Sequence, residues 1–200
     1  MFALPPLLGW IYYFYPELLP SGRQNHGELI VPSRPITDLT LSRLGGETFD
    51  WNELKGKWAL VVISRGYCAE DCRRQLSIGE QLRRGQRAGT QRIQLVLLLL
   101  KKPGELRDQE IRSSAIGAAN ELDAASPVET ADLVLVAQLS AQKQVEERFD
   151  LADVYIEQQF FLIDAYGHLM MRHDMTEVSP QETLADLKTL LTASENWERK

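Results

Sequence analysis

The sequence predicts a three-layer α/β fold in which helices cover both faces of a central mixed β-sheet, preceded by an N-terminal hydrophobic segment. Two continuous apolar runs, residues 58–64 and 93–100, are typical of strands buried on both faces of a sheet. A helical pattern separates these runs, and a hairpin pattern followed by an amphipathic helix closes the chain. The 200 residues, 44% of them hydrophobic and 25% charged, suffice for one domain with a substantial core.

The overall charge excludes several classes of protein. A net charge of -6 and a sequence pI near 5.2 argue against nucleic acid as the main partner, because phosphate binding needs a basic surface. The composition also excludes a disordered chain and a polytopic membrane protein. Two cysteines are too few for a disulfide-rich scaffold, but they lie close enough together to form a site.

The N-terminal segment, residues 1–16, predicts contact with a membrane. It contains no charged side chain, and aromatic residues crowd its second half, as they do at a membrane–water boundary. Since about 20 apolar residues are needed to cross a bilayer, we interpret it as the end of a spanning helix whose upstream part is missing. A terminal segment packed on the domain and a cleaved export signal are the alternatives.

Proline residues punctuate the stretch from residue 17 to residue 40, which predicts an extended linker. Residues 41–200 are then expected to form the folded domain. If the N-terminal segment is an anchor, the protein is a single-pass protein of the bacterial inner membrane with its domain in the periplasm. A nearby cysteine pair can be oxidised in that compartment.

The first apolar run, Trp58–Ser64, predicts a central strand that leads into a turn at Arg65–Tyr67 and then to Cys68. A helical pattern follows over Asp71–Arg84. The second run, Ile93–Leu100, predicts a strand parallel to the first, because two buried strands joined by a helix form a βαβ unit.

The rest of the chain predicts five further elements. Helices are expected over Glu105–Leu122 and Ser140–Phe149, a short strand over Leu133–Ala137, and a hairpin from Gln159–Asp164 and His168–His173. A capping box formed by Ser179 and Glu182, with Pro180 at the first helical position, predicts the start of the C-terminal amphipathic helix.

The two cysteines, Cys68 and Cys72, stand four residues apart where a strand passes into a helix. This spacing places both side chains on one face of a helix. Such a pair can exchange electrons through a disulfide, or it can hold a soft ion such as Cu(I), for which thiolates are suitable ligands. A purely structural disulfide or two inert thiols is the alternative.

The order of elements resembles a thioredoxin-like domain over about Leu41–Ala193. The strand before the cysteines, the motif Tyr67–Cys72 and the hairpin Phe160–Gly167 together resemble the Sco (SenC-type) family of membrane-tethered copper chaperones. This resemblance implies a role in the assembly of cytochrome c oxidase. It further implies that Cys68 and Cys72 are copper ligands, or the dithiol that reduces cysteines of a target.

The chain departs from these families at two places. Residues 154–158, where Sco proteins carry a third, histidine ligand, contain no histidine, so we assign none. No proline lies between residues 127 and 180 to supply the cis-proline of thioredoxin-type oxidoreductases. The segment 168–175 holds further copper-binding residue types, but we expect its methionines (Met170, Met171, Met175) in the core and its histidines (His168, His173) exposed. His26, in the expected linker, could instead fold over the cysteine loop.

The resulting hypothesis is a membrane-tethered periplasmic assembly factor for cytochrome c oxidase. It would act through Cys68 and Cys72 by thiol-disulfide exchange or Cu(I) handling, with an oxidase subunit or another assembly factor as partner. One alternative is a non-catalytic accessory subunit bound to a respiratory oxidase, and another is a general periplasmic thiol reductase. The protein would be an enzyme only under the hypotheses that include thiol-disulfide exchange.

Overall fold

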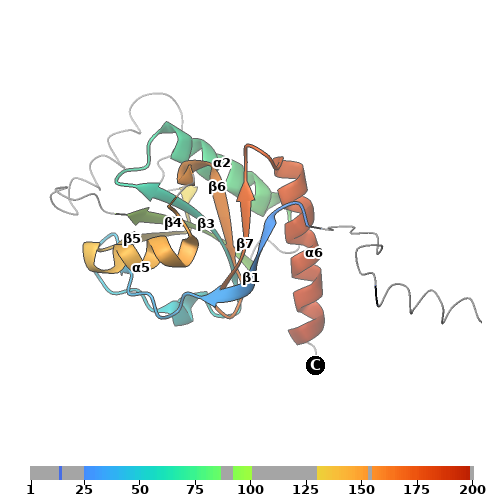
Figure 1. Ribbon diagram of the computed structural model, residues 1–200, viewed down its shortest axis with the longest axis horizontal. Helices are drawn as coiled ribbons and strands as arrows, with labels where there is room; N and C mark the ends of the chain where they lie inside the picture. The colour runs from blue at the N-terminus through green and yellow to red at the C-terminus, as the bar shows by residue number, and fades with distance from the viewer. Residues whose placement is uncertain (1–13, 15–24, 87–91, 101–129, 153–154, 199–200) are drawn as a thin grey trace, which may run out of the picture.

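The computed structural model describes Phe14 and residues 25–86, 92–100, 130–152 and 155–198 (Figure 1). A seven-stranded mixed sheet runs through its centre in the order β1-β7-β6-β3-β4-β5-β2. The strands are β1 (Glu28–Pro35), β2 (Ser42–Arg43), β3 (Trp58–Arg65), β4 (Ile93–Leu100), β5 (Leu133–Ala137), β6 (Gln159–Ile163) and β7 (His168–Asp174). The expected helix 105–122 lies outside the described residues, as does the N-terminal segment 1–16 apart from Phe14.

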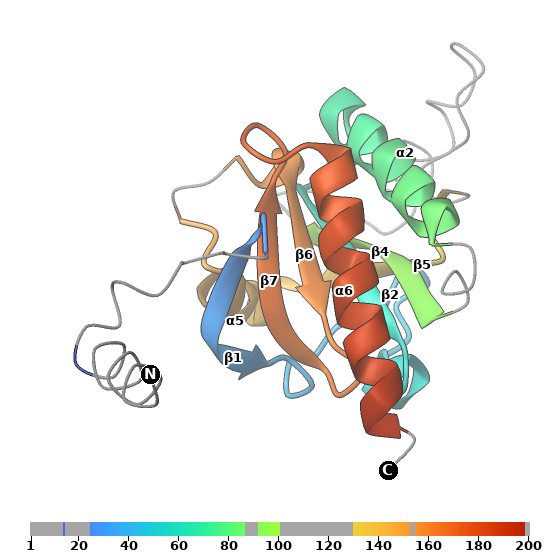
Figure 2. The same ribbon diagram turned by 90° about the vertical axis from the view of Figure 1, so that its right-hand side faces the viewer.

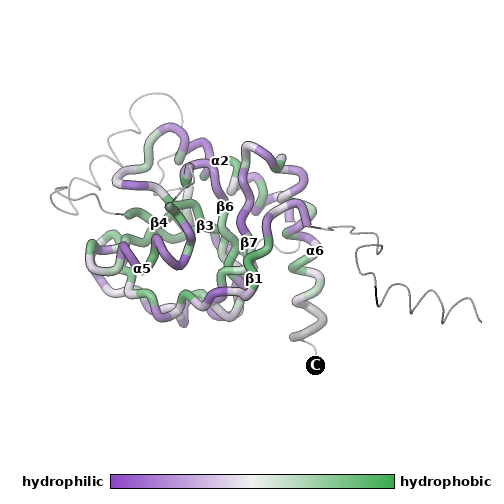
Figure 3. Tube along the Cα trace, viewed as in Figure 1, coloured by the Kyte–Doolittle hydropathy of each residue, from purple (hydrophilic) through white to green (hydrophobic). Residues whose placement is uncertain are grey.

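The two long apolar runs form the centre of the sheet, as predicted. β3 pairs with β4 in parallel from Trp58 opposite Ile93 to Arg65 opposite Leu100, and its other edge pairs antiparallel with β6. Along β3 the side chains alternate between two hydrophobic cores, one on each face of the sheet. Figure 3 shows hydrophobic residues concentrated along these central strands. The strands are apolar throughout because neither face meets water.

Helices cover both faces and complete the three layers. α2 (Glu70–Gly85) and α6 (Pro180–Glu198) pack against each other on one face, where Figure 2 shows them side by side. α5 (Leu139–Phe149) covers the other face through Val145 and Phe149. Two short 3-10 turns, η2 (Trp51–Leu54) and η5 (Ile156–Gln158), lie between the main elements.

The C-terminal helix begins with the predicted capping box. The backbone N–H of Ser179 donates to Oε2 of Glu182 at 2.8 Å, and the N–H of Glu182 donates to Oγ of Ser179 at 3.4 Å. Both groups lack a partner within the helix, so each side chain satisfies the other residue's backbone. Pro180 begins the helix where its missing N–H costs nothing.

The expected linker is structured over its second half, which corrects the sequence prediction for residues 28–40. Residues 28–35 form the edge strand β1, antiparallel to β7, and Ile36 and Leu39 are buried in the core. The prolines of this stretch misled the prediction, because proline is tolerated in an edge strand, whose outer N–H groups need no partner. An exposed ion pair between Arg172 and Glu28 joins β7 to β1.

Candidate functional site

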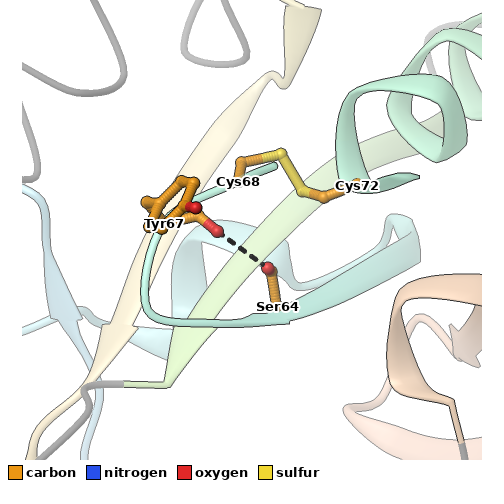
Figure 4. The surroundings of a disulfide bond; sticks show 4 residues. All are labelled: Ser64, Tyr67, Cys68 and Cys72. Carbon is orange, nitrogen blue, oxygen red and sulfur yellow. Dashed lines mark hydrogen bonds between the residues drawn. A yellow bond between two sulfur atoms is a disulfide. The ribbon is translucent and has the colours of Figure 1, made fainter. Parts of the chain in front are cut away.

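Cys68 and Cys72 form a disulfide just beyond the C-terminal end of the central strand β3, where α2 begins (Figure 4). Their Cα atoms lie 5.2 Å apart, within the usual range for such a bond. The structure therefore brings together the two sulfur atoms that the sequence singles out.

The loop between the strand and the cysteines is held in a fixed shape. Gly66 has φ of +85°, a conformation that favours glycine, and its N–H donates to the carbonyl of Leu100 at 2.7 Å. Oγ of the buried Ser64 donates to the carbonyl of Tyr67 at 3.1 Å (Figure 4). These bonds turn the chain away from the sheet and deliver Cys68 to its edge.

The two cysteines differ in exposure. Cys68 keeps 9% of its surface exposed, whereas Cys72 is fully buried in the first turns of α2. Of the two residues, only Cys68 therefore retains some contact with the surface. A thiolate that attacks one sulfur of a disulfide expels the other.

Large exposed side chains also lie near the disulfide, at the end of the sheet where β3 finishes. Parallel strands finish at the same end of a sheet, and β6, antiparallel to β3, begins there. Tyr67 follows β3 and is 53% exposed, Leu139 follows β5 and is 56% exposed, and Tyr155 precedes β6 and is 81% exposed. Such side chains are suited to contact another protein around the disulfide.

The donor set fits a Cu(I) ion only in part. In the dithiol form Cys68 and Cys72 would supply two soft sulfur ligands, the type that Cu(I) prefers. Within the described ranges no group of three or more His, Cys, Asp or Glu side chains could hold a metal ion. The η5 turn, which packs against α2, contains no histidine.

The residues of β7 and the turn that follows it depart from the expected exposure. Met171 is buried as predicted, but His173, expected at the surface, is also fully buried. Burial alternates regularly along β7, so His173, two residues after the buried Met171, is buried as well. His168 remains partly exposed. His173 tolerates burial because its Nε2 lies 3.0 Å from Oδ2 of Asp186 in α6.

Asp186, which the sequence did not single out, is the acceptor of a buried cluster that ties β7 and the start of β1 to α6. Its Oδ2 accepts from the backbone N–H groups of His26 and Gly27, both at 2.9 Å, and its Oδ1 lies 3.0 Å from Nδ1 of His26. His26 therefore contacts α6 rather than serving as a ligand at the cysteine loop. The only sequence signal is an acid among the leucines on the buried side of an amphipathic helix.

The environment shifts the pKa of both buried groups. Burial lowers the pKa of His173 below its ordinary 6.5, and the hydrogen bond that His173 donates to Asp186 opposes this shift only in part. Burial alone would raise the pKa of Asp186, but hydrogen bonds from Gly27, His26 and His173 outweigh it, so this pKa is lowered. At neutral pH the cluster holds an ionised carboxylate and a neutral His173.

We expect stability to fall on acidification below about pH 6.5. There the unfolded chain protonates His173 while the folded protein, with its lowered pKa, does not, so protons favour unfolding. Urea unfolding between pH 7.5 and pH 5, above the range of the carboxylates, measures the loss. His168→Gln, at a partly exposed position, should retain this pH dependence, and a wild-type stability that stays constant would contradict the expectation.

The family model described as transmembrane-like, thioredoxin-like, C-terminal domain matches residues 58–194, from β3 into α6, and includes both cysteines. The chain belongs to this family. Within the described residues, none of the helices combines the length and apolar character needed to cross a bilayer. Comparison with curated proteins finds no match.

The solved structures that are similar to this chain include Sco proteins and a thiol:disulfide interchange protein. Yeast Sco1 with copper bound has a TM-score of 0.55 at 16% identity, covering 86% of this chain and 95% of that one. A thiol:disulfide interchange protein from Bacteroides sp. has a TM-score of 0.50 at 14% identity, covering 83% and 90%. BsSco, a member of the Sco family of cytochrome c oxidase assembly proteins, has a TM-score of 0.51 at 17% identity, covering 79% and 94%. At these identities the similarity establishes the thioredoxin-like fold.

Proposed function

We propose that the protein is an assembly factor for cytochrome c oxidase that acts through Cys68 and Cys72. The observation that supports this most directly is a disulfide where strand β3 of a thioredoxin-like sheet ends, with 9% of Cys68 exposed and Cys72 fully buried. This difference in exposure would let an attacking thiolate approach the disulfide from the side of Cys68. Similar folds in proteins described as Sco and as thiol:disulfide interchange proteins support this reading.

The exchange reaction uses the difference between the two sulfurs. A thiolate of the target attacks Sγ of Cys68, the bond between Cys68 and Cys72 breaks, and Cys72 takes its electron pair. A second target thiolate then attacks the target sulfur of the mixed disulfide and expels Cys68 as a thiolate. Two electrons pass to the protein, and the target leaves as a disulfide. The reverse sequence reduces a disulfide of the target.

Copper handling is the second part of the proposal. In the dithiol form the two sulfurs, one in the loop before α2 and one in its first turn, could hold Cu(I) as cargo for transfer to the oxidase. Yeast Sco1, the similar structure with copper, supports this idea. Reduction of the disulfide must come first, because the bonded sulfurs offer no thiolate.

Tethering through residues 1–16 and a periplasmic position of the domain complete the proposal. The periplasm is kept oxidising, so the disulfide could reform after each cycle there. An enzyme reporter that works only in the periplasm should be active when it is fused to the C-terminus. A reporter active in the cytoplasm would contradict this part of the proposal.

Replacing either cysteine with serine tests the function. We expect the reduced wild type to bind Cu(I) or to pass its two electrons to glutathione disulfide and close the Cys68–Cys72 bond. Neither Cys68→Ser nor Cys72→Ser should bind Cu(I) through the pair or form this internal bond, and Cys72→Ser should stop at the mixed disulfide between Cys68 and glutathione. In cells that lack the protein, the wild type should restore oxidase copper and neither variant should. Ser64→Ala, which leaves both sulfurs in place, is the matched control for damage to the loop.

Two outcomes would favour the alternatives. If a variant lacking both cysteines still supports oxidase assembly, the protein is an accessory subunit that acts through its surface. If the wild type turns over generic disulfides and its loss leaves oxidase copper unchanged, the protein is a general thiol reductase.

A further inference from the structure

Gln75 lies one helical turn after Cys72 on the buried face of α2. Only 4% of its surface is exposed, and Cys72 is fully buried. Residues three apart on a helix are neighbours, with Cβ atoms about 5–6 Å apart. The amide of Gln75 and the sulfur of Cys72 therefore share one side of the helix, away from water.

The amide nitrogen of Gln75 is an unsatisfied donor. Within the described part of the chain, its buried Nε2 atom has no hydrogen-bond partner. Gln86, the buried glutamine that caps the C-terminus of this helix, donates from Nε2 to the carbonyl of Leu184 at 3.3 Å. Buried donors are nearly always paired, and an exception calls for an explanation such as a redox role. Among the described residues, Nε1 of Trp58, at the start of β3, is a second unpaired buried donor, but Gln75 is the one that lies one helical turn from the sulfur of Cys72.

Reduction of the disulfide changes what surrounds this donor. A sulfur in a disulfide is neutral and a weak acceptor, whereas the sulfur that leaves carries an electron pair and a negative charge. Cys72 would hold that charge in a buried position, where an ion without a hydrogen bond is costly. An N–H group one turn away can supply a charge-assisted hydrogen bond.

We propose that the amide of Gln75 donates a hydrogen bond to the thiolate of Cys72 and so shifts the exchange equilibrium of the pair toward the dithiol. This inference rests on the proposed exchange function of the same two cysteines. Two effects act in one direction. The disulfide form keeps an unpaired donor, and the dithiol form gives that donor a partner. Gln75 thus makes the disulfide easier to reduce.

The test equilibrates the full chain with reduced and oxidised glutathione. One glutathione thiolate attacks Cys68 and expels Cys72, and a second attacks the glutathione sulfur of the mixed disulfide, which yields the dithiol and glutathione disulfide. Gln75→Met removes the amide at similar volume. We expect its equilibrium constant for reduction to fall about tenfold, which is a potential about 30 mV more negative.

Gln86→Met is the matched control, because it removes a buried amide at the C-terminal end of the same helix, away from the sulfurs. It should leave the equilibrium constant within about twofold of the wild type. Gln75→Ala is the second variant if Gln75→Met does not fold, as judged by circular dichroism. An unchanged constant in a folded Gln75 variant, or an equal shift in Gln86→Met, would overturn the inference alone. A wild type that does not exchange at all would overturn the proposed exchange function together with it.

Discussion

Replacing Asp186 with alanine is expected to lower the free energy of unfolding by about 3 kcal/mol. The carboxylate is completely buried and accepts hydrogen bonds from Nε2 of His173 and from the backbone N–H groups of His26 and Gly27. Alanine leaves these donors without a partner, and His173, buried in the protein, cannot turn to water. Urea unfolding with the disulfide intact measures the change.

Asp186→Asn separates the hydrogen bonds from the charge. An asparagine oxygen in the place of Oδ2 could still accept from His173, His26 and Gly27, and its amide could donate to Nδ1 of His26 in the other tautomer. The expected loss is therefore about 1 kcal/mol. Equal losses in the two variants would show that the charge of the carboxylate, rather than its acceptors, stabilises the cluster.

The elements that the sequence predicts well have local signals. The run at β3 is apolar at every position because both faces are buried, and no distant partner is needed to recognise it. The start of α6 is likewise recognisable from Ser179, Pro180 and Glu182 alone. In contrast, β1 exists because β7 lies beside it, and its prolines are ordinary linker residues until that partner is known.

The candidate site also has features with a local sequence signal and features that depend on distant residues. The short spacing of Cys68 and Cys72 predicts that their sulfurs lie close together, but the expected common helix face is wrong, because Cys68 lies in the loop before α2. The spacing does not predict that Cys72 is fully buried while Cys68 keeps 9% of its surface exposed, because burial depends on packing against the sheet. The partners of His173 and the unpaired donor of Gln75 are also invisible in the sequence. Each depends on residues that only the fold brings together or excludes.

Phe161→Ala is expected to lower the free energy of unfolding by about 3–5 kcal/mol. Phe161 is fully buried in β6, paired with Val61 of β3, and its ring meets Phe149 of α5 edge to face with centroids 5.3 Å apart. Alanine would leave a cavity where sheet and helix meet and would remove the aromatic contact as well. Thermal and urea unfolding both measure the loss.

Tyr166→Ala is the matched aromatic control, because Tyr166 is 66% exposed in the turn after the same strand. Its expected change is within about 0.5 kcal/mol. Phe161 belongs to the core on the side of the sheet opposite that of Cys68 and Cys72. The glutathione equilibrium of the folded Phe161→Ala variant should therefore match the wild type even though the fold is weaker. A shift as large as that expected for Gln75→Met would mean that the redox balance of the pair follows global stability rather than the groups beside its sulfurs.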